Sequence, residues 1–345
     1  MHTMTLSAGD IAAITPLIDR VLTDYDSIED PGLARIAPLI AHELPCSVRT
    51  FLAEFRLDEP SGACVLSGFP VDDERIGDTP AHWRRSANAR LSPTLRQEVF
   101  FLLCASLLGD LFAWSTQQDG LLMHDVMPIR GHEQEQLGSG SEQVLWWHTE
   151  DAFHPFKGDY VALMCLRNPD AVATTLADAA RIRWADLDLD TLFAPNYTIR
   201  PDESHLPKNR GDEQDEDPAR AALVDAGYRR ITALNENPPP VPLLTGDRNA
   251  PYMCLDPYFM AVDDLEPAAR KAFESVVEAI DAAVQDVVLR PGDCIFIDNL
   301  RAVHGRNPFH ARFDGKDRWL KRLNISRDLR RSREARLSSS HRVIF

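Results

Sequence analysis

The sequence predicts one large domain that is mainly β, with helices packed around it. Short apolar segments bounded by turn residues recur along the chain, and three longer segments repeat apolar residues with the period of a helix. The chain has 345 residues, a length that all-β barrels and sandwiches can reach as single units. Its 44% hydrophobic and 26% charged residues are typical of a globular protein with a sizeable core.

Three helices are expected, at residues 7–25, 94–110 and 266–289. The second segment, "TLRQEVFFLLCASLLGD", repeats apolar residues every three or four positions. The third begins with an acidic residue followed by Pro267, and both are favoured in the first turn of a helix. These helices are expected to flank the core.

Three strands are expected, at 159–166 ("DYVALMCL"), 293–298 ("DCIFID") and 318–326 ("RWLKRLNIS"). Turn signals such as "RPGD" and "DGKD" bound them. The segment 208–220, "KNRGDEQDEDPAR", is polar, acidic and aperiodic, which indicates a surface loop. A lid and a solvated flexible insertion both remain open for this loop.

Charge and targeting signals restrict the partners and the location. The net charge of −16 argues against nucleic acid and against an anionic membrane surface, and it favours a cationic small molecule as partner. The six cysteines are scattered without a CxxC pair, as in a cytosolic protein with reduced thiols. The first twenty residues do not resemble a signal peptide, and no run of about twenty apolar residues occurs, so a cytoplasmic location is expected.

The stretch "WWHTEDAFHP", residues 146–155, concentrates ionisable side chains. Because side chains alternate along a strand, His148 and Glu150 are expected to share one face and to chelate one ion. An HxE pair alone is a weak signal, but His304 in "DNLRAVHGR" offers a third ligand. Two histidines and a carboxylate form the facial triad of non-haem Fe(II) oxygenases. Asp151 and His154 are not expected to be ligands, since Asp151 faces the opposite way and His154 is expected either behind the ligands or at the surface.

Two arginines share one face of the strand expected at 318–326. Alternation places Arg318 and Arg322 together, with Lys321 on the opposite face. Burying a guanidinium group is costly unless it meets an anion, and its planar fork suits a carboxylate. Two carboxylates near a metal fit an oxo acid and an amino acid. Surface ion pairs are the alternative interpretation.

The segments "WHTEDAFHP", "LRNPD", "DNLRAVHGR" and "FDGKDRWLKR" together resemble the clavaminate-synthase-like Fe(II)/2-oxoglutarate oxygenases. Within that family the chain looks most like the arginine hydroxylases of viomycin and streptothricin-type antibiotic biosynthesis. The similarity runs from "IAHELP" near residue 40 to "DLRRSREAR" near the end. The resemblance implies a double-stranded β-helix, or jelly roll, in a single domain over 1–345. Residues 1–90 would be mostly helical, and 91–345 would form the core, with a lid insertion near 202–222.

The resemblance also implies roles for individual residues. The iron ligands match His148, Glu150 and His304, and Arg318 matches the residue that binds the distal carboxylate of 2-oxoglutarate. Thr174 and Ser139 match lesser contacts to 2-oxoglutarate. The expected substrate contacts are Gln117, Glu150, Asp202, Ser204, Asp256, Tyr258 and Arg322.

Within this set, Arg322 would bind the substrate α-carboxylate, Gln117 its amino group and Asp256 its guanidinium group. One position departs from the viomycin-pathway pattern, because Tyr258 stands where a second aspartate is expected. The form "LDPYF" looks more like the streptothricin-pathway enzyme. With Tyr258 in place of an aspartate, the guanidinium group would have one carboxylate partner fewer.

The implied activity is hydroxylation of C3, C4 or both in free L-arginine or a close guanidino amino acid, with Fe(II), 2-oxoglutarate and O2. Desaturation of arginine between C4 and C5 is an alternative, as is hydroxylation of enduracididine, lysine or citrulline. A zinc hydrolase would need the three metal ligands but no oxo-acid site. A non-catalytic jelly-roll binding protein would not need an intact set of ligands.

Overall fold

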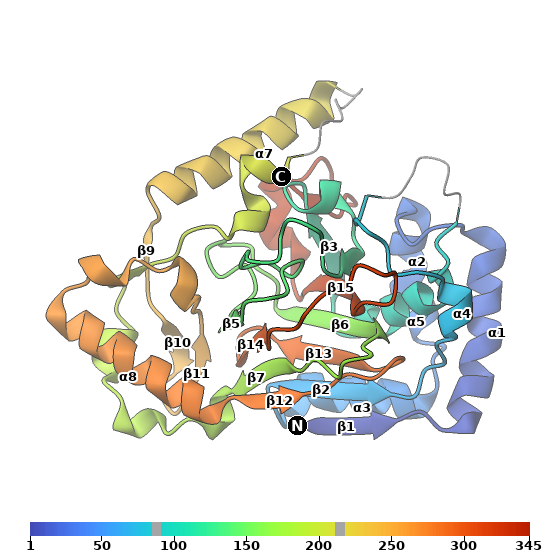
Figure 1. The fold of residues 1–345 in the computed structure, drawn as a ribbon, viewed down its shortest axis with the longest axis horizontal. Coiled ribbons are helices and arrows are strands. Elements are labelled where there is room, and N and C mark those ends of the chain that lie inside the picture. Colours follow the sequence, from blue (N-terminus) through green and yellow to red (C-terminus); the bar gives the residue numbers. More distant parts are fainter. Residues whose placement is uncertain (85–90, 211–217) are drawn as a thin grey trace.

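The computed structural model describes residues 1–84, 91–210 and 218–345 (Figure 1). The helices are α1 (Ala8–Asp24), α2 (Pro31–Ala41), α3 (Cys46–Asp58), α4 (Asp73–Ile76), α5 (Leu95–Ser106), α6 (Leu189–Leu192), α7 (Pro218–Glu236) and α8 (Pro267–Ala283). The first strands are β1 (His2–Thr5), β2 (Ala63–Ser67), β3 (Asp110–Trp114), β4 (His124–Val126), β5 (Leu145–His148), β6 (Tyr160–Arg167), β7 (Thr174–Asp178) and β8 (Tyr197–Thr198). The remaining strands are β9 (Pro240–Val241), β10 (Leu244–Asp247), β11 (Ala250–Met253), β12 (Gln285–Val287), β13 (Cys294–Asp298), β14 (Ala302–Arg306), β15 (Trp319–Ser326) and β16 (Val343–Ile344).

Two main sheets form the centre of the molecule. The large sheet has the order β1-β2-β13-β6-β15-β3-β16, and β4 also pairs with β15. The small sheet has the order β12-β7-β14-β5, and all its pairs are antiparallel. Strands that are distant in the sequence are therefore neighbours, which brings β5 beside β14 and β4 beside β15.

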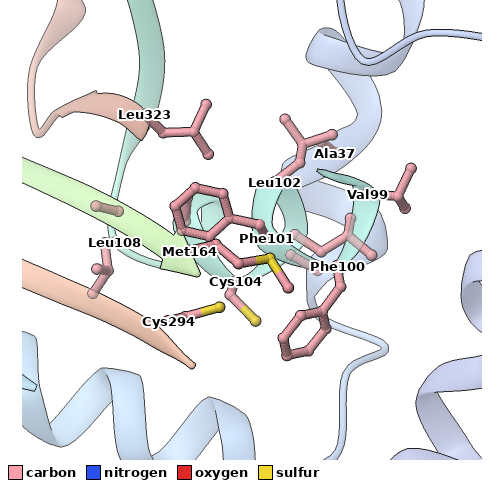
Figure 2. Close-up of a cluster of buried hydrophobic side chains, with 14 of the residues drawn as sticks. Ala37, Val99, Phe100, Phe101, Leu102, Cys104, Leu108, Met164, Cys294 and Leu323 are labelled. Atoms are coloured by element: carbon pink, nitrogen blue, oxygen red, sulfur yellow. The ribbon is translucent and has the colours of Figure 1, made fainter. Parts of the chain in front are cut away.

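A layer of helices covers the outer face of the large sheet. Ten of the twelve residues of α5 are buried, because α5 lies between the sheet and the N-terminal helices. Figure 2 shows this contact, with Phe101 on α5 close to Met164 on β6 and Leu323 on β15. From Val99 to Ala105 this helix is apolar all round, as expected for a stretch with no solvent face.

The inner face of the large sheet packs against the small sheet. Along β13, Ile295 and Ile297 point into this contact, together with Leu176 of β7 and Ala302 of β14. The alternate residues of β13 belong to the helical side instead. On the far side of the small sheet, α8 packs in a further apolar cluster. The order of layers is therefore helices, large sheet, small sheet and α8.

Two predicted helices end earlier in the structure than in the sequence analysis. The helix expected at 94–110 ends at Ser106, because β3 begins at Asp110 and pairs with β15. The helix expected at 266–289 ends at Ala283, because β12 pairs with β7. The expected strands agree with β6, β13 and β15 to within one residue at each end.

The segment near 202–222 is only partly described. It contains short 3-10 helices at Glu203–His205 and Pro207–Asn209 and the beginning of α7, while 211–217 lies outside the described residues. Residues 85–90, within the region expected to be mostly helical, also lie outside them. In the part of the chain that is described, no helix is long and apolar enough to cross a membrane.

Candidate active site

One cavity of about 360 Å³ lies where strands of the two main sheets face each other. Strands β4 and β15 of the large sheet line it, as do β5, β7 and β14 of the small sheet. The structure brings all the sequence-predicted site residues to this cavity. They are Gln117, Ser139, His148, Glu150, Thr174, Asp202, Ser204, Asp256, Tyr258, His304, Arg318 and Arg322.

The three candidate metal ligands converge. His148 ends β5 and lies opposite His304 of β14 in the strand register. Oε2 of Glu150 is 3.7 Å from Nε2 of His148 and 3.2 Å from Nε2 of His304. One ligand atom from each residue lies within 4.8 Å of the other two. Two imidazole nitrogens and one carboxylate oxygen are the donor set of a non-haem iron site.

A hydrogen bond to its other ring nitrogen prepares His148 for a metal, whereas Nδ1 of the buried His304 has no hydrogen-bond partner among the described residues. Nδ1 of His148 is 2.8 Å from the carbonyl oxygen of Trp146, so Nδ1 carries the proton and Nε2 is free to bind a metal. Burial alone would raise the pKa of Glu150, but Arg322 and the two histidines hold it well below its usual value. The carboxylate is therefore ionised, as a ligand must be. The residues fit an iron ion.

Glu150 does not lie on the strand where the sequence analysis placed it. Strand β5 ends at His148, and Glu150 lies in the following turn. The backbone N–H of Thr149 donates to Leu255 (2.7 Å), and that of Glu150 donates to the side chain of Asn299 (2.8 Å). These bonds pull the chain out of the sheet, so the expectation of two ligands on one strand face was wrong, although the side chains still converge.

Asn299 is a site residue that sequence reasoning missed. Its side chain is 1% exposed and also donates to the carbonyl oxygens of Glu150 (3.0 Å) and Gly158 (2.9 Å). It therefore fixes the backbone of a candidate ligand from 149 residues away in the sequence. The only signal was its place directly after the predicted strand 293–298.

Arg318 and Arg306 form a buried cationic region beside Thr174. NH2 of Arg318 donates to Oγ1 of Thr174 (3.2 Å), and its Nε has no hydrogen-bond partner among the described residues. Arg306 donates to backbone carbonyl oxygens, including those of Gly140 and Gln143. Burial lowers the pKa of Arg318 to about 10, and burial with the neighbouring Arg318 lowers that of Arg306 to about 9. Such a pair calls for an anionic ligand.

Ser139, the other expected 2-oxoglutarate contact, lines the same cavity. Its hydroxyl lies 2.9 Å from Nδ1 of His132, and its carbonyl oxygen accepts from Ile129. The structure thus places Ser139 on the cavity wall with its hydroxyl bonded within the protein.

Arg322 lies at the centre of a polar network. One NH group contacts Glu150, and NH2 lies 2.9 Å from Oε1 of Gln117 and 2.7 Å from Nδ1 of His124. The amide of Gln117 in turn donates to Ser204 (2.6 Å). His124 was not singled out in the sequence, and its buried ring accepts from Arg322 because burial, reinforced by Arg322, holds its pKa well below normal.

The opposite side of the cavity is acidic. Asp256 is 8% exposed, and burial raises its pKa to about 7. Among the described residues, no Lys or Arg side chain lies within ion-pair distance of it. Asp202 accepts hydrogen bonds from the backbone N–H (2.9 Å) and hydroxyl (2.5 Å) of Ser204. Tyr258 is half exposed at the mouth of the cavity.

The two ionisable residues set aside as non-ligands are both buried. His154 is 3% exposed and packs on Trp114, with ring centroids 4.2 Å apart, so the option of a surface position was wrong. The chain turns after β5, and this turn directs His154 inward. Asp151 accepts hydrogen bonds from Trp114 (2.6 Å) and His205 (3.0 Å).

Comparison with known proteins gives the family. Residues 61–324 match the model of the taurine catabolism dioxygenase TauD, TfdA family. The chain belongs to this family of dioxygenases. That assignment agrees with the resemblance seen in the sequence motifs.

Two curated relatives match the TauD/TfdA chain over its whole length. It is 52% identical to an L-ornithine/L-arginine 3-hydroxylase of Catenulispora acidiphila, over 100% of both chains. It is 48% identical to an enduracididine beta-hydroxylase of Streptomyces hygroscopicus, again over 100% of both.

A solved structure shares the fold. OrfP, a non-heme iron oxygenase in complex with Fe, succinate and (3S)-hydroxy-L-Arg, matches with a TM-score of 0.91 and 44% identity over 100% of both chains. Another structure of OrfP, with Fe and alpha-ketoglutaric acid, matches with a TM-score of 0.84 and 43% identity over 99% of this chain and 100% of that one. The mixed sheets and helices described above are therefore the fold of an iron oxygenase.

Proposed function

We propose that the protein is an Fe(II)/2-oxoglutarate-dependent hydroxylase of a free L-amino acid with a cationic side chain, and that L-arginine or a close guanidino relative is its substrate. The observation that carries the substrate class is Asp256, a buried carboxylate in the same cavity as the metal set that pairs with no Lys or Arg in the described part of the chain. A buried unpaired charge is costly, so a cationic ligand group is favoured there. The relatives that act on arginine, ornithine and enduracididine support this class.

We infer the following division of roles. His148, Glu150 and His304 would hold the iron, which supplies O2 activation and the oxidative decarboxylation of 2-oxoglutarate to succinate and carbon dioxide. Arg318 and Thr174 would bind the distal carboxylate of 2-oxoglutarate. The OrfP structure with Fe and alpha-ketoglutaric acid supports this cofactor pair.

The remaining residues orient the amino acid. Arg322 exchanges its contact with Glu150 for the substrate carboxylate, and Gln117 meets the amino group. Asp256 pairs with the side-chain cation, while Asp202 and Ser204 complete the wall. Orientation of this kind decides which carbon is attacked, because a shift of about 1 Å changes reactivity strongly.

The same proposal extends to the architecture. Two packed sheets with strands from distant parts of the chain support a double-stranded β-helix core in a single oxygenase domain over 1–345. The helices before residue 85 pack on the large sheet and support their inclusion in that domain. Six cysteines in the thiol form support a cytoplasmic location.

The test is the mass of the product. Anaerobically purified protein is given Fe(II), 2-oxoglutarate and a panel of free amino acids, and O2 is then admitted. Gain of one oxygen atom in arginine, with one succinate formed per product, is the expected result. Loss of two hydrogens identifies a desaturase, and preference for a neutral amino acid such as citrulline contradicts the substrate class.

A further inference from the structure

A histidine outside the predicted site is fully buried beneath the substrate-facing wall. His205 is 0% exposed and ends the short 3-10 helix Glu203–His205. Its neighbours Asp202 and Ser204 line the cavity, whereas His205 does not. A single turn of 3-10 helix has little stability of its own, so contacts with the rest of the protein must fix its position.

Both ring nitrogens of His205 are bonded. Nε2 lies 3.0 Å from Oδ1 of Asp151, and Nδ1 lies 2.7 Å from the hydroxyl of Thr116. The edges of the aromatic rings of Trp114 and Phe153 surround the imidazole, with centroids 5.8 and 5.0 Å away. The ring is thus held in one orientation from four sides.

Asp151 connects this contact to the metal site. It directly follows Glu150, and its φ of 52° lies in the left-handed region that residues other than glycine rarely adopt. Trp114 Nε1 donates to Oδ2 of Asp151 at 2.6 Å, so both carboxylate oxygens are engaged. An unfavourable backbone conformation persists only where its surroundings fix it. The hydrogen bond between the buried side chains of His205 and Asp151 therefore joins the wall segment, residues 202–205, to the turn after Glu150.

We propose that His205 is a positioning residue, which fixes the wall segment 202–205 against the turn after Glu150 and so places Asp202 and Ser204 for the substrate. The inference rests on the proposed function of the cavity. The segment has a second connection through Gln117, which donates to Ser204 and accepts from Arg322. That connection involves groups that would bind the substrate, whereas His205 itself does not line the cavity, although its partner Asp151 does.

A second metal site is the competing interpretation of this cluster. Ligand atoms of Asp151, Asp202 and His205 lie within 4.8 Å of one another. However, the oxygens of Asp151 and the nitrogens of His205 are bonded to protein groups, and Oδ1 of Asp202 accepts from Ser204. Both oxygens of Asp151 and both nitrogens of His205 are thus bonded within the protein, which leaves only Oδ2 of Asp202, 3.7 Å from Nε2 of His205, for an ion. The cluster therefore joins two segments of the chain and is not a metal centre.

The test compares His205→Phe with His154→Phe. Both histidines are buried in the same aromatic surroundings, and both substitutions keep a ring while removing the ring nitrogens. His154 accepts only a local bond, from the N–H of Phe156 (3.0 Å), and among the described residues it makes no hydrogen bond to the wall segment. It is therefore a matched control for the loss of a buried imidazole.

Two readouts are measured on the full chain. The first is amide hydrogen exchange of the peptide that covers 199–206, which does not depend on turnover. The second is the KM for L-arginine beside the KM for 2-oxoglutarate, with Fe(II) present. We expect His205→Phe to raise both the exchange rate and the KM for arginine about tenfold and to leave the KM for 2-oxoglutarate within about twofold, because the buried hydrogen bonds of both ring nitrogens are lost, the one to Asp151 being charge-assisted. His154→Phe should change none of these by more than about twofold.

The outcomes separate this inference from the proposed function. Faster exchange in His205→Phe, in a protein that consumes no amino acid, retains the positioning role and rejects the proposed function. Unchanged exchange and an unchanged KM for arginine, in an active enzyme, reject the positioning role. So does an equal effect of the two substitutions.

A milder variant covers the case in which His205→Phe does not fold. Thr116→Val removes only the contact to Nδ1 and should raise the exchange rate about threefold, with the KM for arginine rising in parallel. An exchange rate equal to that of the wild type would overturn the proposal.

Discussion

Three of the guanidinium groups that line the cavity are buried (Arg306 and Arg318) or partly buried (Arg322), and their partners differ in a way that suggests different ligands. Arg322 contacts an ionised carboxylate, Glu150, while within the described residues Arg306 and Arg318 make hydrogen bonds only to neutral oxygens. Burying a guanidinium group is costly unless it pairs with an anion. The two neutral-bonded arginines therefore suit an incoming dianion, and Arg322 suits a ligand that displaces its contact with Glu150.

The first prediction separates these roles. Arg318→Ala should raise the KM for 2-oxoglutarate about tenfold or more and change the KM for arginine little, because a charge-assisted pair contributes about 1.5–3 kcal/mol. Arg322→Ala should act mainly on the KM for the amino acid. Steady-state kinetics with each substrate varied in turn make the comparison. Equal effects of both substitutions on both substrates would show that the ligands are not divided in this way.

The second prediction concerns the ionisation of Asp256. Burial raises its pKa to about 7, so its ionised fraction falls as the pH drops through that value. Only the ionised form offers a countercharge to a guanidinium group. The ratio of kcat/KM for arginine to that for neutral citrulline should therefore rise with pH through about 7 and then level off. Taking the ratio removes titrations that affect both substrates alike.

Asp256→Asn is the matched variant, because the amide keeps the shape and removes the charge. It should lower the ratio about tenfold or more and make it independent of pH, since a buried cation without a countercharge costs several kcal/mol. A ratio unchanged from the wild type would remove Asp256 from the substrate site.

At the scale of elements, the sequence predicted strands well where one face is uniformly apolar and predicted ends poorly where distant groups decide them. Period-two alternation in 318–326 placed Arg318 and Arg322 on the cavity side and Lys321 on the other, as observed. The end of β5 depends instead on bonds from Leu255 and Asn299, more than 100 residues away. No local pattern could report them.

The residues of the site follow the same division. The candidate metal ligands could be found because their types and spacing are chemically distinctive. His205, Asn299 and His124 could not, because an isolated histidine or asparagine becomes a site residue only through partners that the fold supplies.

The third prediction concerns the attachment of β15 to its neighbours. Lys321 is fully buried, with its Nζ 3.0 Å from Glu98 of α5 and 2.5 Å from Asp125 of β4. Lys321→Met should lower the free energy of unfolding by about 3–5 kcal/mol, because it removes a buried cation that contacts two buried carboxylates. Urea unfolding measures the loss.

Lys316→Met is the control for that experiment. Lys316 also pairs with two carboxylates, those of Asp73 (3.3 Å) and Asp78 (3.7 Å), but its side chain is 49% exposed. An exposed pair contributes about 0–1 kcal/mol. If the two substitutions cost the same, burial of the Lys321 cluster does not determine its contribution.

At the scale of the whole molecule, the layers place charge of both signs inside an acidic protein. The chain carries a net charge of −16, yet arginines of both main sheets meet in one cavity, from β14 and from the start of β15. At the cavity the two sheets face each other through charged side chains that are available to a ligand. The apolar packing between the sheets lies further along the same contact. Ligand binding should therefore be linked to the stability of the whole fold.

The last prediction uses this linkage. A ligand that binds only the folded protein stabilises it by about 2.7 kcal/mol at one hundred times its dissociation constant. With Mn(II) in place of iron, 2-oxoglutarate should raise the Tm clearly, whereas 2-oxobutanoate at the same concentration should raise it less, since it lacks the second carboxylate that Arg318 and Thr174 would bind. In Arg318→Ala the difference between the two oxo acids should shrink, because the substitution removes one of the contacts that distinguish them. If the wild type already responds equally to both, the buried pair Arg306 and Arg318 does not recognise the distal carboxylate, and the cationic side of the cavity must bind some other anion.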